Sequence, residues 1–284
     1  MQLFHTLREL RAFLDGHADR RIGFVPTMGN LHAGHCQLVR LAKSQADIVV
    51  VSIFVNPLQF GINEDFGTYP RTLPADCEQL QAVGADVVFA PAVEEMYPDF
   101  DGQDLQQQVI VQPPSLANDL CGASRPGHFA GVATVVTKLF HMVKPQLAVF
   151  GKKDYQQLMV IKSLVRQLNF DIDIVGAETM REDSGLAMSS RNGYLTAAQK
   201  TQATQLYAQL QQLSAALQQG RRDYDALCAE AEHALKEKGW QVDYVAVRTQ
   251  HDLRVPSAGQ KKLVILAAAK LGHTRLIDNC EVSL

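Results

Sequence analysis

The chain has 284 residues, enough for one large domain or two modest ones, and 46 % of them are apolar, which suffices for a substantial core. Its formal charge is −3, whereas proteins that bind nucleic acid or anionic membranes carry an excess of basic residues, so we expect neither partner. No apolar run approaches the roughly 18 residues that a membrane-spanning helix needs.

The N-terminus and the cysteines favour the cytoplasm. Residues 1–6 lack a basic region followed by an apolar core, so no signal peptide is predicted. The five cysteines form an odd count without any C-x-x-C pair, which is typical of reduced residues used for packing. We therefore expect a cytoplasmic protein.

Helices and strands are expected to alternate through the first part of the chain. The helical spacing of Leu7, Leu10 and Leu14 predicts an amphipathic helix, and the apolar run at 21–25 predicts a buried strand. The expected elements that follow are a helix at 34–46, a strand at 47–55, a helix at 75–83, a strand at 86–90, a helix at 130–143, a strand at 147–150, a helix at 157–168 and a strand at 172–175. Such alternation requires a parallel sheet with right-handed crossovers.

Two segments between these elements have weaker patterns. Residues 107–111 are expected to form a strand, and residues 118–125 a mobile loop.

The composition changes at residues 176–190. Thr196 is a candidate N-cap for a long helix with leucines at 206, 210, 213 and 217. A second helix at 223–238 and strands at 242–247, 263–268 and 275–277 are expected to follow. We therefore predict a Rossmann-like doubly wound parallel sheet in residues 1–178 and a smaller α+β lid domain in residues 179–284.

Two imidazoles stand where the first buried strand gives way to a helix. His32 and His35 lie at the expected helix N-terminus, which offers unpaired N–H groups and about half a positive charge. Gly29 and Gly34 beside them let the backbone approach a ligand closely. Such a turn favours an anion site. Histidines here also serve as simple caps or surface residues, while a zinc site lacks a third ligand with regular spacing.

Three more polar segments are candidates for binding. Gln59, after the second buried strand, and Gln157 offer neutral amides to a small polar substrate. Lys153 offers a point charge for phosphate, and Asp154 an acceptor for ribose hydroxyls. Residues 188–193 carry two hydroxyls and a guanidinium in a row, which suits a polyphosphate. Taken alone, each segment is also compatible with a solvated loop.

Together these motifs resemble a known family. Residues 26–35 resemble the H-x-G-H signature of the nucleotidyltransferase superfamily, and the longer run P-T-M-G-x-L-H-x-G-H is similar to the pantothenate synthetase (pantoate–β-alanine ligase) family. Further matches are V-N-P-L-Q-F at 55–60, Y-P-R-T at 69–72, A-S-R-P-G-H-F at 123–129, S-S-R-N-G-Y-L at 189–195 and L-I-D-N at 276–279. The resemblance covers nearly the whole chain. One departure is Lys152, where the family typically carries Glu, which changes the local charge at the ATP site.

The resemblance implies roles for particular residues. It implies that Gln59 and Gln157 bind pantoate, with Gln59 also serving β-alanine. We expect His32 and His35 to contact the phosphates and His35 to be the proton donor, because an unperturbed imidazole titrates at about 6.5. Mg²⁺ is expected to bridge the phosphate oxygens, with Asp76 as a partner through water. The implied catalytic residues are His35, His32, Lys153, Ser189, Ser190 and Arg191. The implied ATP-binding residues are Met28, Gly29, Asn30, Leu31, His32, Ala33, Gly34, His35, Gly151, Lys152, Lys153, Asp154, Met180, Met188, Ser189, Ser190 and Arg191.

The resemblance also implies an activity. An ATP-dependent ligase of this family activates (R)-pantoate as pantoyl adenylate with release of pyrophosphate, and the amine of β-alanine then displaces AMP to give pantothenate, a coenzyme A precursor. A homodimer formed through the larger domain is implied as well. One alternative is an enzyme of the same superfamily that transfers AMP to a phosphate. The two neutral glutamines favour a small hydroxy acid over such a phosphorylated substrate. Another is an adenine-nucleotide sensor without catalysis.

Overall fold

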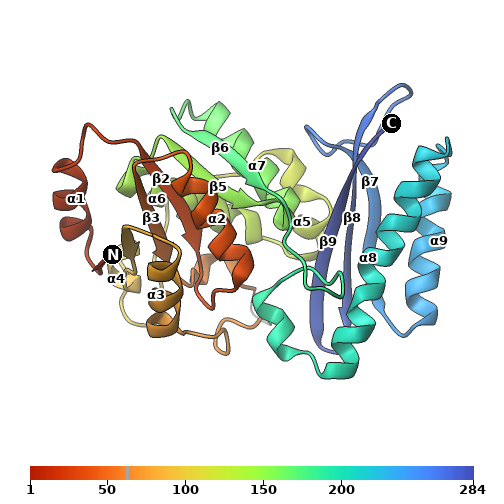
Figure 1. The fold of residues 1–284 in the computed structure, drawn as a ribbon, viewed down its shortest axis with the longest axis horizontal. Coiled ribbons are helices and arrows are strands. Elements are labelled where there is room, and N and C mark those ends of the chain that lie inside the picture. Colours follow the sequence, from red (N-terminus) through yellow and green to blue (C-terminus); the bar gives the residue numbers. More distant parts are fainter. Residues whose placement is uncertain (62–63) are drawn as a thin grey trace.

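The computed structural model describes residues 1–61 and 64–284. It has a larger N-terminal domain and a smaller C-terminal domain that lie side by side (Figure 1). Six parallel strands form the sheet of the larger domain, in the order β1-β4-β3-β2-β5-β6. They are β1 (Gln2–Phe4), β2 (Ile22–Thr27), β3 (Ile48–Ile53), β4 (Val87–Phe89), β5 (Leu147–Gly151) and β6 (Asp173–Ala177).

Helices cover both faces of this sheet. Phe24 of β2 packs into a core with α1, α6 and α7, whereas the next residue, Val25, packs with α2 and α3 on the opposite face. The helices of this domain are α1 (Leu7–Asp15), α2 (Ala33–Lys43), α3 (Leu73–Ala82), α4 (Val93–Met96), α5 (Cys121–Ser124), α6 (His128–Val143) and α7 (Tyr155–Gln167). The predicted Rossmann-like doubly wound parallel sheet is confirmed.

The smaller domain is an antiparallel sheet with two helices. Its strands are β7 (Gln241–Thr249), β8 (Lys262–Leu271) and β9 (Thr274–Ser283), and its helices are α8 (Ala197–Gln218) and α9 (Tyr224–Glu237). Thr196 caps α8 as predicted, because its hydroxyl accepts the N–H of Gln199 while the Gln199 side chain accepts the N–H of Thr196. The predicted smaller α+β domain is confirmed.

The small sheet is covered on both faces. Ile265 of β8 packs toward α8 and α9, whereas its neighbour Val264 packs in an apolar cluster with Leu120, Tyr155 and Met159 of the larger domain. The two domains therefore share an apolar layer. The proposed boundary after residue 178 lies one residue beyond the end of β6.

Three segments differ from the sequence-based expectations. Residues 107–111 are not a strand: they run without a partner strand in the described structure, and Val109 is 78 % exposed. Residues 118–125 are not a loop, because Gln156 of α7 donates to the carbonyls of Leu116 and Asp119 and so holds two helical turns, η2 (Ser115–Asn118) and α5. The pattern missed β1, which is only three residues long.

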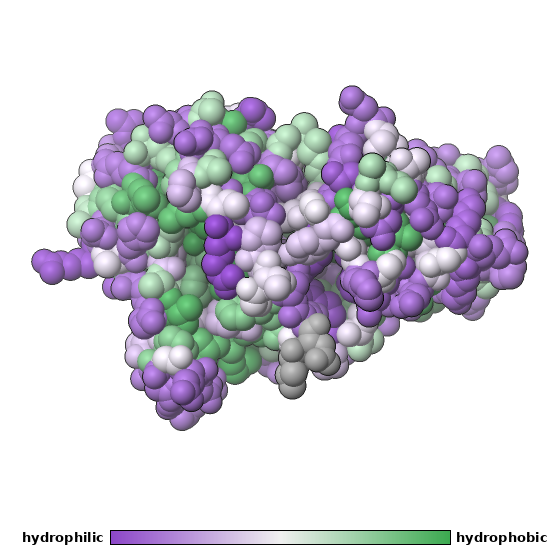
Figure 2. Space-filling model, turned by 90° about the horizontal axis from the view of Figure 1, so that it is seen from below, coloured by the Kyte–Doolittle hydropathy of each residue, from purple (hydrophilic) through white to green (hydrophobic). Residues whose placement is uncertain are grey.

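The two domains differ in the hydropathy of their surfaces. On the face shown in Figure 2, apolar residues gather on the larger domain, at the left, whereas the smaller domain is mostly hydrophilic. Over the described residues, no helix combines the length and the apolar character needed to cross a bilayer.

Candidate active site

A buried carboxylate shapes the turn between β2 and α2. Asp76 of α3 is 1 % exposed, and its two oxygens accept the N–H groups of Asn30 at 3.0 Å and Leu31 at 2.8 Å. The Thr72 hydroxyl donates to it as well, at 3.1 Å. Gly29 has φ +80°, which favours glycine. Asp76 therefore fixes the turn that presents the histidines; its link to magnesium stays a prediction.

The two histidines cap the start of α2 reciprocally. Nδ1 of His32 accepts the N–H of Gly34 at 3.1 Å, and Nδ1 of His35 accepts the N–H of His32 at 3.3 Å. Because a backbone N–H can only donate, the proton of each neutral ring lies on Nε2. Gly34 is required for this packing, since a Cβ there would lie 2.8 Å from Cε1 of His32. Both rings thus keep an Nε2–H free to donate.

Both imidazoles are neutral near pH 7. Burial, with a smaller effect from His32, lowers the pKa of His35 to about 3, and burial together with the charge of Lys153 lowers the pKa of His32 to about 4. In this environment His35 does not titrate near the ordinary imidazole value of about 6.5, and its role as a proton donor stays a prediction.

The candidate residues gather around one cavity of 240 Å³ between the histidine turn and residues 178–191. The expected residues that line it are Met28, His32, Gly34, His35, Gln59, Gly151, Lys153, Asp154, Gln157, Met180, Met188, Ser189, Ser190 and Arg191. Five expected ATP-binding residues are absent from its described lining: Gly29, Asn30, Leu31, Ala33 and Lys152. The first four build the turn and the start of α2, and Lys152 points elsewhere.

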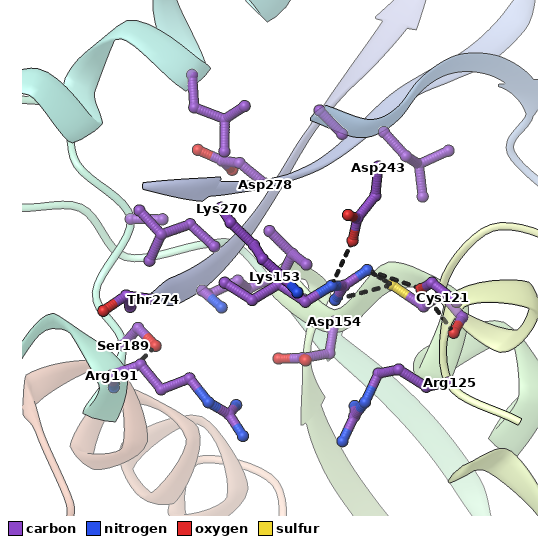
Figure 3. A pocket seen from close by; sticks show the side chains of 18 of the residues that line it. Cys121, Arg125, Lys153, Asp154, Ser189, Arg191, Asp243, Lys270, Thr274 and Asp278 are labelled. Carbon is purple, nitrogen blue, oxygen red and sulfur yellow. Dashed lines mark hydrogen bonds and ion pairs between the residues drawn. The ribbon is translucent and has the colours of Figure 1, made fainter. Parts of the chain in front are cut away.

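A second cavity, of 770 Å³, adjoins the first and is lined by both domains. Lys153, Asp154 and Arg191 line both cavities. Figure 3 shows Lys270 reaching into this space from the smaller domain, with Arg125 of the larger domain on the other side of Asp154. The two cavities are therefore neighbours, and the histidines line the smaller one.

The histidine turn and the Ser-Ser-Arg turn touch each other. The hydroxyl of Ser190 donates to the carbonyl of Asn30 at 2.9 Å, although 160 residues separate them. The neighbouring Arg191 is paired with Asp65, which sequence reasoning missed because nothing in the local pattern links two residues 126 positions apart. The two turns therefore lie on the same side of the molecule.

The side chain of Gln59 lines the smaller cavity and is largely buried. It is 9 % exposed, and its Oε1 accepts from Asn56 Nδ2 at 3.1 Å. The backbone carbonyl of Gln59 accepts from Nδ1 of His128 at 2.8 Å, and Nη1 of Arg125 lies 2.9 Å from Nε2 of the same ring. Burial and the adjacent Arg125 lower the pKa of His128 to about 4.

Arg125 is itself held by Glu64. Its Nε and Nη2 each lie 2.6 Å from a carboxylate oxygen of Glu64. Burial opposes ionisation of this carboxyl, but the Arg125 hydrogen bonds and charge outweigh it and lower the pKa of Glu64 to about 2. The A-S-R-P-G-H-F segment thus supports the loop that carries Gln59.

The chain is similar to known proteins over nearly its whole length. A family model described as pantoate-beta-alanine ligase matches residues 2–281. The chain belongs to the pantoate–β-alanine ligase family. The chain is 56 % identical over 284 residues to the pantothenate synthetase of Neisseria meningitidis serogroup C, covering 100 % of both chains. To that of Methylobacillus flagellatus it is 55 % identical, covering 100 % of this chain and 99 % of the other.

Solved structures of pantoate–β-alanine ligases have the same fold. The crystal structure of the Thermus thermophilus pantothenate synthetase matches with a TM-score of 0.92 and 43 % identity, covering 100 % of both chains. The Francisella tularensis pantoate-beta-alanine ligase, complexed with beta-gamma ATP and beta-alanine, matches with a TM-score of 0.82 and 35 % identity, over 99 % of this chain and 97 % of the other. As a pantoate–β-alanine ligase, the enzyme condenses pantoate with β-alanine at the expense of ATP.

Proposed function

We propose that both half-reactions take place in the cavity between the histidine turn and the Ser-Ser-Arg turn. In the first, the carboxylate of (R)-pantoate attacks the α-phosphorus of ATP, giving pantoyl adenylate and pyrophosphate. In the second, the amine of β-alanine attacks the activated carbonyl, and AMP leaves. The observation that carries this proposal is the contact of Ser190 with Asn30, because it places both turns at one cavity.

The histidines and the cationic loops serve the phosphates. Nε2–H groups of neutral His32 and His35 donate to the α-phosphate, where negative charge rises during attack. Lys153, Ser189 and Arg191 hold the β- and γ-phosphates, together with Ser190 once it leaves Asn30. Since a carboxylate nucleophile needs little chemical help, positioning and charge neutralisation account for most of the rate.

The two glutamines bind the acids. Gln59 and Gln157 line the smaller cavity and bind pantoate, and Gln59 also contacts β-alanine. Asn56 fixes the orientation of the Gln59 amide, because its own Oδ1 accepts from the buried Tyr97 hydroxyl at 2.5 Å, leaving Nδ2 to donate. Neutral amides suit a hydroxy acid, since they hydrogen-bond hydroxyl and carboxylate groups without adding charge.

Magnesium is proposed to accompany ATP. The described residues contain no group of three or more His, Cys, Asp or Glu side chains arranged to hold a metal ion. The donor set therefore fits an ion held mainly by phosphate oxygens and water, as Mg²⁺ prefers, and not a cage of protein ligands. When bound, the ion offsets phosphate charge. Asp76 is the carboxylate expected to reach it through water, although its oxygens are shared with the turn.

One assay tests the proposal against its alternatives. The enzyme is mixed with ATP and pantoate and followed for pyrophosphate release; β-alanine is then added and AMP and pantothenate are measured. The expected result is pyrophosphate release before β-alanine is present, and AMP release only after it is added. An adenylylated phosphate product would favour the related transferases, and nucleotide binding without turnover would favour a sensor.

The proposal includes a homodimer formed through the larger domain. Val109 and Ile110 are 78 % and 42 % exposed, in a segment that is neither helix nor strand and that no described strand of this chain pairs with. Neighbouring Val111 is anchored by its N–H to the Thr134 hydroxyl at 2.9 Å, so the segment is held in place while its apolar side chains face outward. A second copy of the chain is the occupant proposed for this strip.

The cytoplasm is the proposed compartment. All five cysteines lie in the described parts of the chain, and all are free thiols. Disulfides form and persist in oxidising compartments, so free cysteines suit a reducing one. The use of ATP as a substrate also favours the cytoplasm.

A further inference from the structure

The two lysines of the loop at 151–154 point in different directions. Lys153 lines both cavities, whereas Lys152 is absent from the described lining of either. Instead, Nζ of Lys152 lies 2.7 Å from a carboxylate oxygen of Glu281 on β9 and is hydrogen-bonded to Glu178 as well. Its side chain is only 20 % exposed. The side chain of Lys152 is thereby directed away from both cavities.

Glu281 has a second partner in the larger domain. Its other carboxylate oxygen accepts from the Tyr155 hydroxyl at 2.8 Å. Tyr155 is the first residue of α7 and directly follows the loop. One carboxylate of the smaller domain thus holds the loop residue Lys152 and the helix that begins after the loop.

Asn279, two residues earlier on β9, holds the backbone of the same loop. Its Nδ2 donates to the carbonyls of Lys152 and Lys153, both at 2.8 Å. Asn279 is 7 % exposed, so these bonds form away from solvent, where an unpaired carbonyl is costly. Both protons of one amide group are thereby committed to neighbouring carbonyls, which holds the two successive peptide groups after Lys152 and after Lys153.

We propose that Asn279 and Glu281 are positioning residues, which hold the loop so that Lys153 alone of the two lysines faces the nucleotide. This inference rests on the proposed role of Lys153 in binding the phosphates of ATP. The smaller domain then acts on the nucleotide at two places: directly, through Ser189 to Arg191, and through β9 by way of Lys153.

The charges in this network agree with that role. Lys152 is partly desolvated, which by itself lowers its pKa, but the bonds to Glu178 and Glu281 outweigh burial and raise it. Lys152 therefore stays a cation that balances two carboxylates. Replacing it with Glu, as is typical of the family, places three carboxylates together in this chain, and we expect the loop to move.

Charge reversal tests the proposal. The variants are Lys152→Glu, Glu281→Lys and the double variant, studied in the full-length enzyme. Kd is measured for a nonhydrolysable ATP analogue, and KM is measured for ATP and for β-alanine. Each single variant is expected to raise Kd and the KM for ATP about tenfold, since small misplacements of a positioned group have large effects on rate and binding. The KM for β-alanine is expected to stay unchanged, and the double variant is expected to restore nucleotide binding.

A matched control is the pair Lys236 and Glu232 on α9, joined at 3.1 Å on the exposed face of the smaller domain. Lys236→Glu is expected to change neither Kd nor KM. If Lys152→Glu does not fold, Glu281→Gln and Asn279→Asp replace it: the first keeps the shape and the Tyr155 contact, and the second turns the donor of both loop bonds into an acceptor. Melting temperatures report folding separately.

The outcomes separate this inference from the function on which it rests. If the wild type releases pyrophosphate with pantoate, but the single variants bind the analogue as the wild type does, the positioning role is refuted and the function stands. Equal rises in the KM for ATP and for β-alanine, or no recovery in the double variant, also refute it. If the wild type releases no pyrophosphate, the function fails, and the Kd comparison still tests the network.

Discussion

The guanidinium of Arg191 lies against the carboxylate of Asp65, with Nη2 2.9 Å from Oδ1 and Nε 3.2 Å from Oδ2. Arg191 belongs to the Ser-Ser-Arg turn and lines both cavities. Burial works against its charge, but the bonds to Asp65 outweigh burial and raise the pKa of Arg191. With Arg191 in its proposed role, an incoming triphosphate has to compete with a carboxylate for this arginine.

Asp65→Asn is expected to lower the KM for ATP by about threefold to tenfold, because it removes both the competitor and a negative charge near the phosphates. Steady-state kinetics with saturating pantoate and β-alanine measure the change. Asp183→Asn, at an exposed aspartate of the smaller domain, is the matched control and should have no effect. A rise in the KM for ATP would show instead that Asp65 orients Arg191.

His35→Ala is expected to slow adenylate formation by about 10²–10³-fold, the usual cost of losing one donor to a developing charge. Single-turnover release of pyrophosphate with ATP and pantoate measures this step. His233→Ala, at an imidazole whose side chain is 75 % exposed on α9, serves as the control. Circular dichroism should show the same fold in both variants. Turnover near that of the wild type would remove His35 from the proposed mechanism.

Stability is expected to fall as the pH drops from 6.5 to 4.5. His35 and His128 have a folded pKa of about 3 and about 4, below the value of about 6.5 in the unfolded chain. In this window the unfolded state binds more protons, so the free energy of unfolding decreases by up to about 1.4 kcal/mol per pH unit for each histidine. Glu64, with a folded pKa of about 2, adds to the loss only below about pH 4.5.

Urea denaturation between pH 4.5 and 7.5 checks this dependence. His128→Asn should reduce the slope with pH, whereas His233→Asn should leave it unchanged. A free energy of unfolding that stays constant across the window would mean that these imidazoles titrate normally in the folded enzyme.

Val109→Asp combined with Ile110→Asp is expected to convert a dimer into a monomer. Two carboxylates on the exposed apolar strip oppose its burial against a second copy, because a buried charge without a partner is costly. Light scattering over a range of concentrations measures the mass. Leu168→Asp, at a leucine that is 50 % exposed after α7, is the control. A wild type that is monomeric at all concentrations would refute the dimer.

Local patterns were sufficient to predict the fold class and most of the helices and strands. Phe24 and Val25 show why: a strand buried on both faces needs consecutive apolar residues, and that run is visible in the sequence. The capping box of Thr196 is equally local. Sequence motifs also identified candidate site residues at the ends of these elements, such as Lys153 and the two histidines.

Contacts between distant segments were not predictable. No pattern indicates that Asp65 pairs with Arg191 or that Asp76 holds the backbone of Asn30, since these partners meet only after the sheet has formed. The segment at 107–111 has the composition of a strand, but no strand of its own chain pairs with it in the described structure. The lowered pKa values of the histidines depend on burial, which the motif does not encode.

The apolar layer between Val264 and Leu266 of β8 and Tyr155 and Met159 of α7 has a consequence for how the molecule can be divided. If the chain were cut after residue 178, the larger part and the smaller part would each expose an apolar surface that is buried in the intact protein. We therefore expect heating to melt both halves in one cooperative transition. A truncated nucleotide-binding fragment should aggregate, so we expect activity to require both parts of the chain.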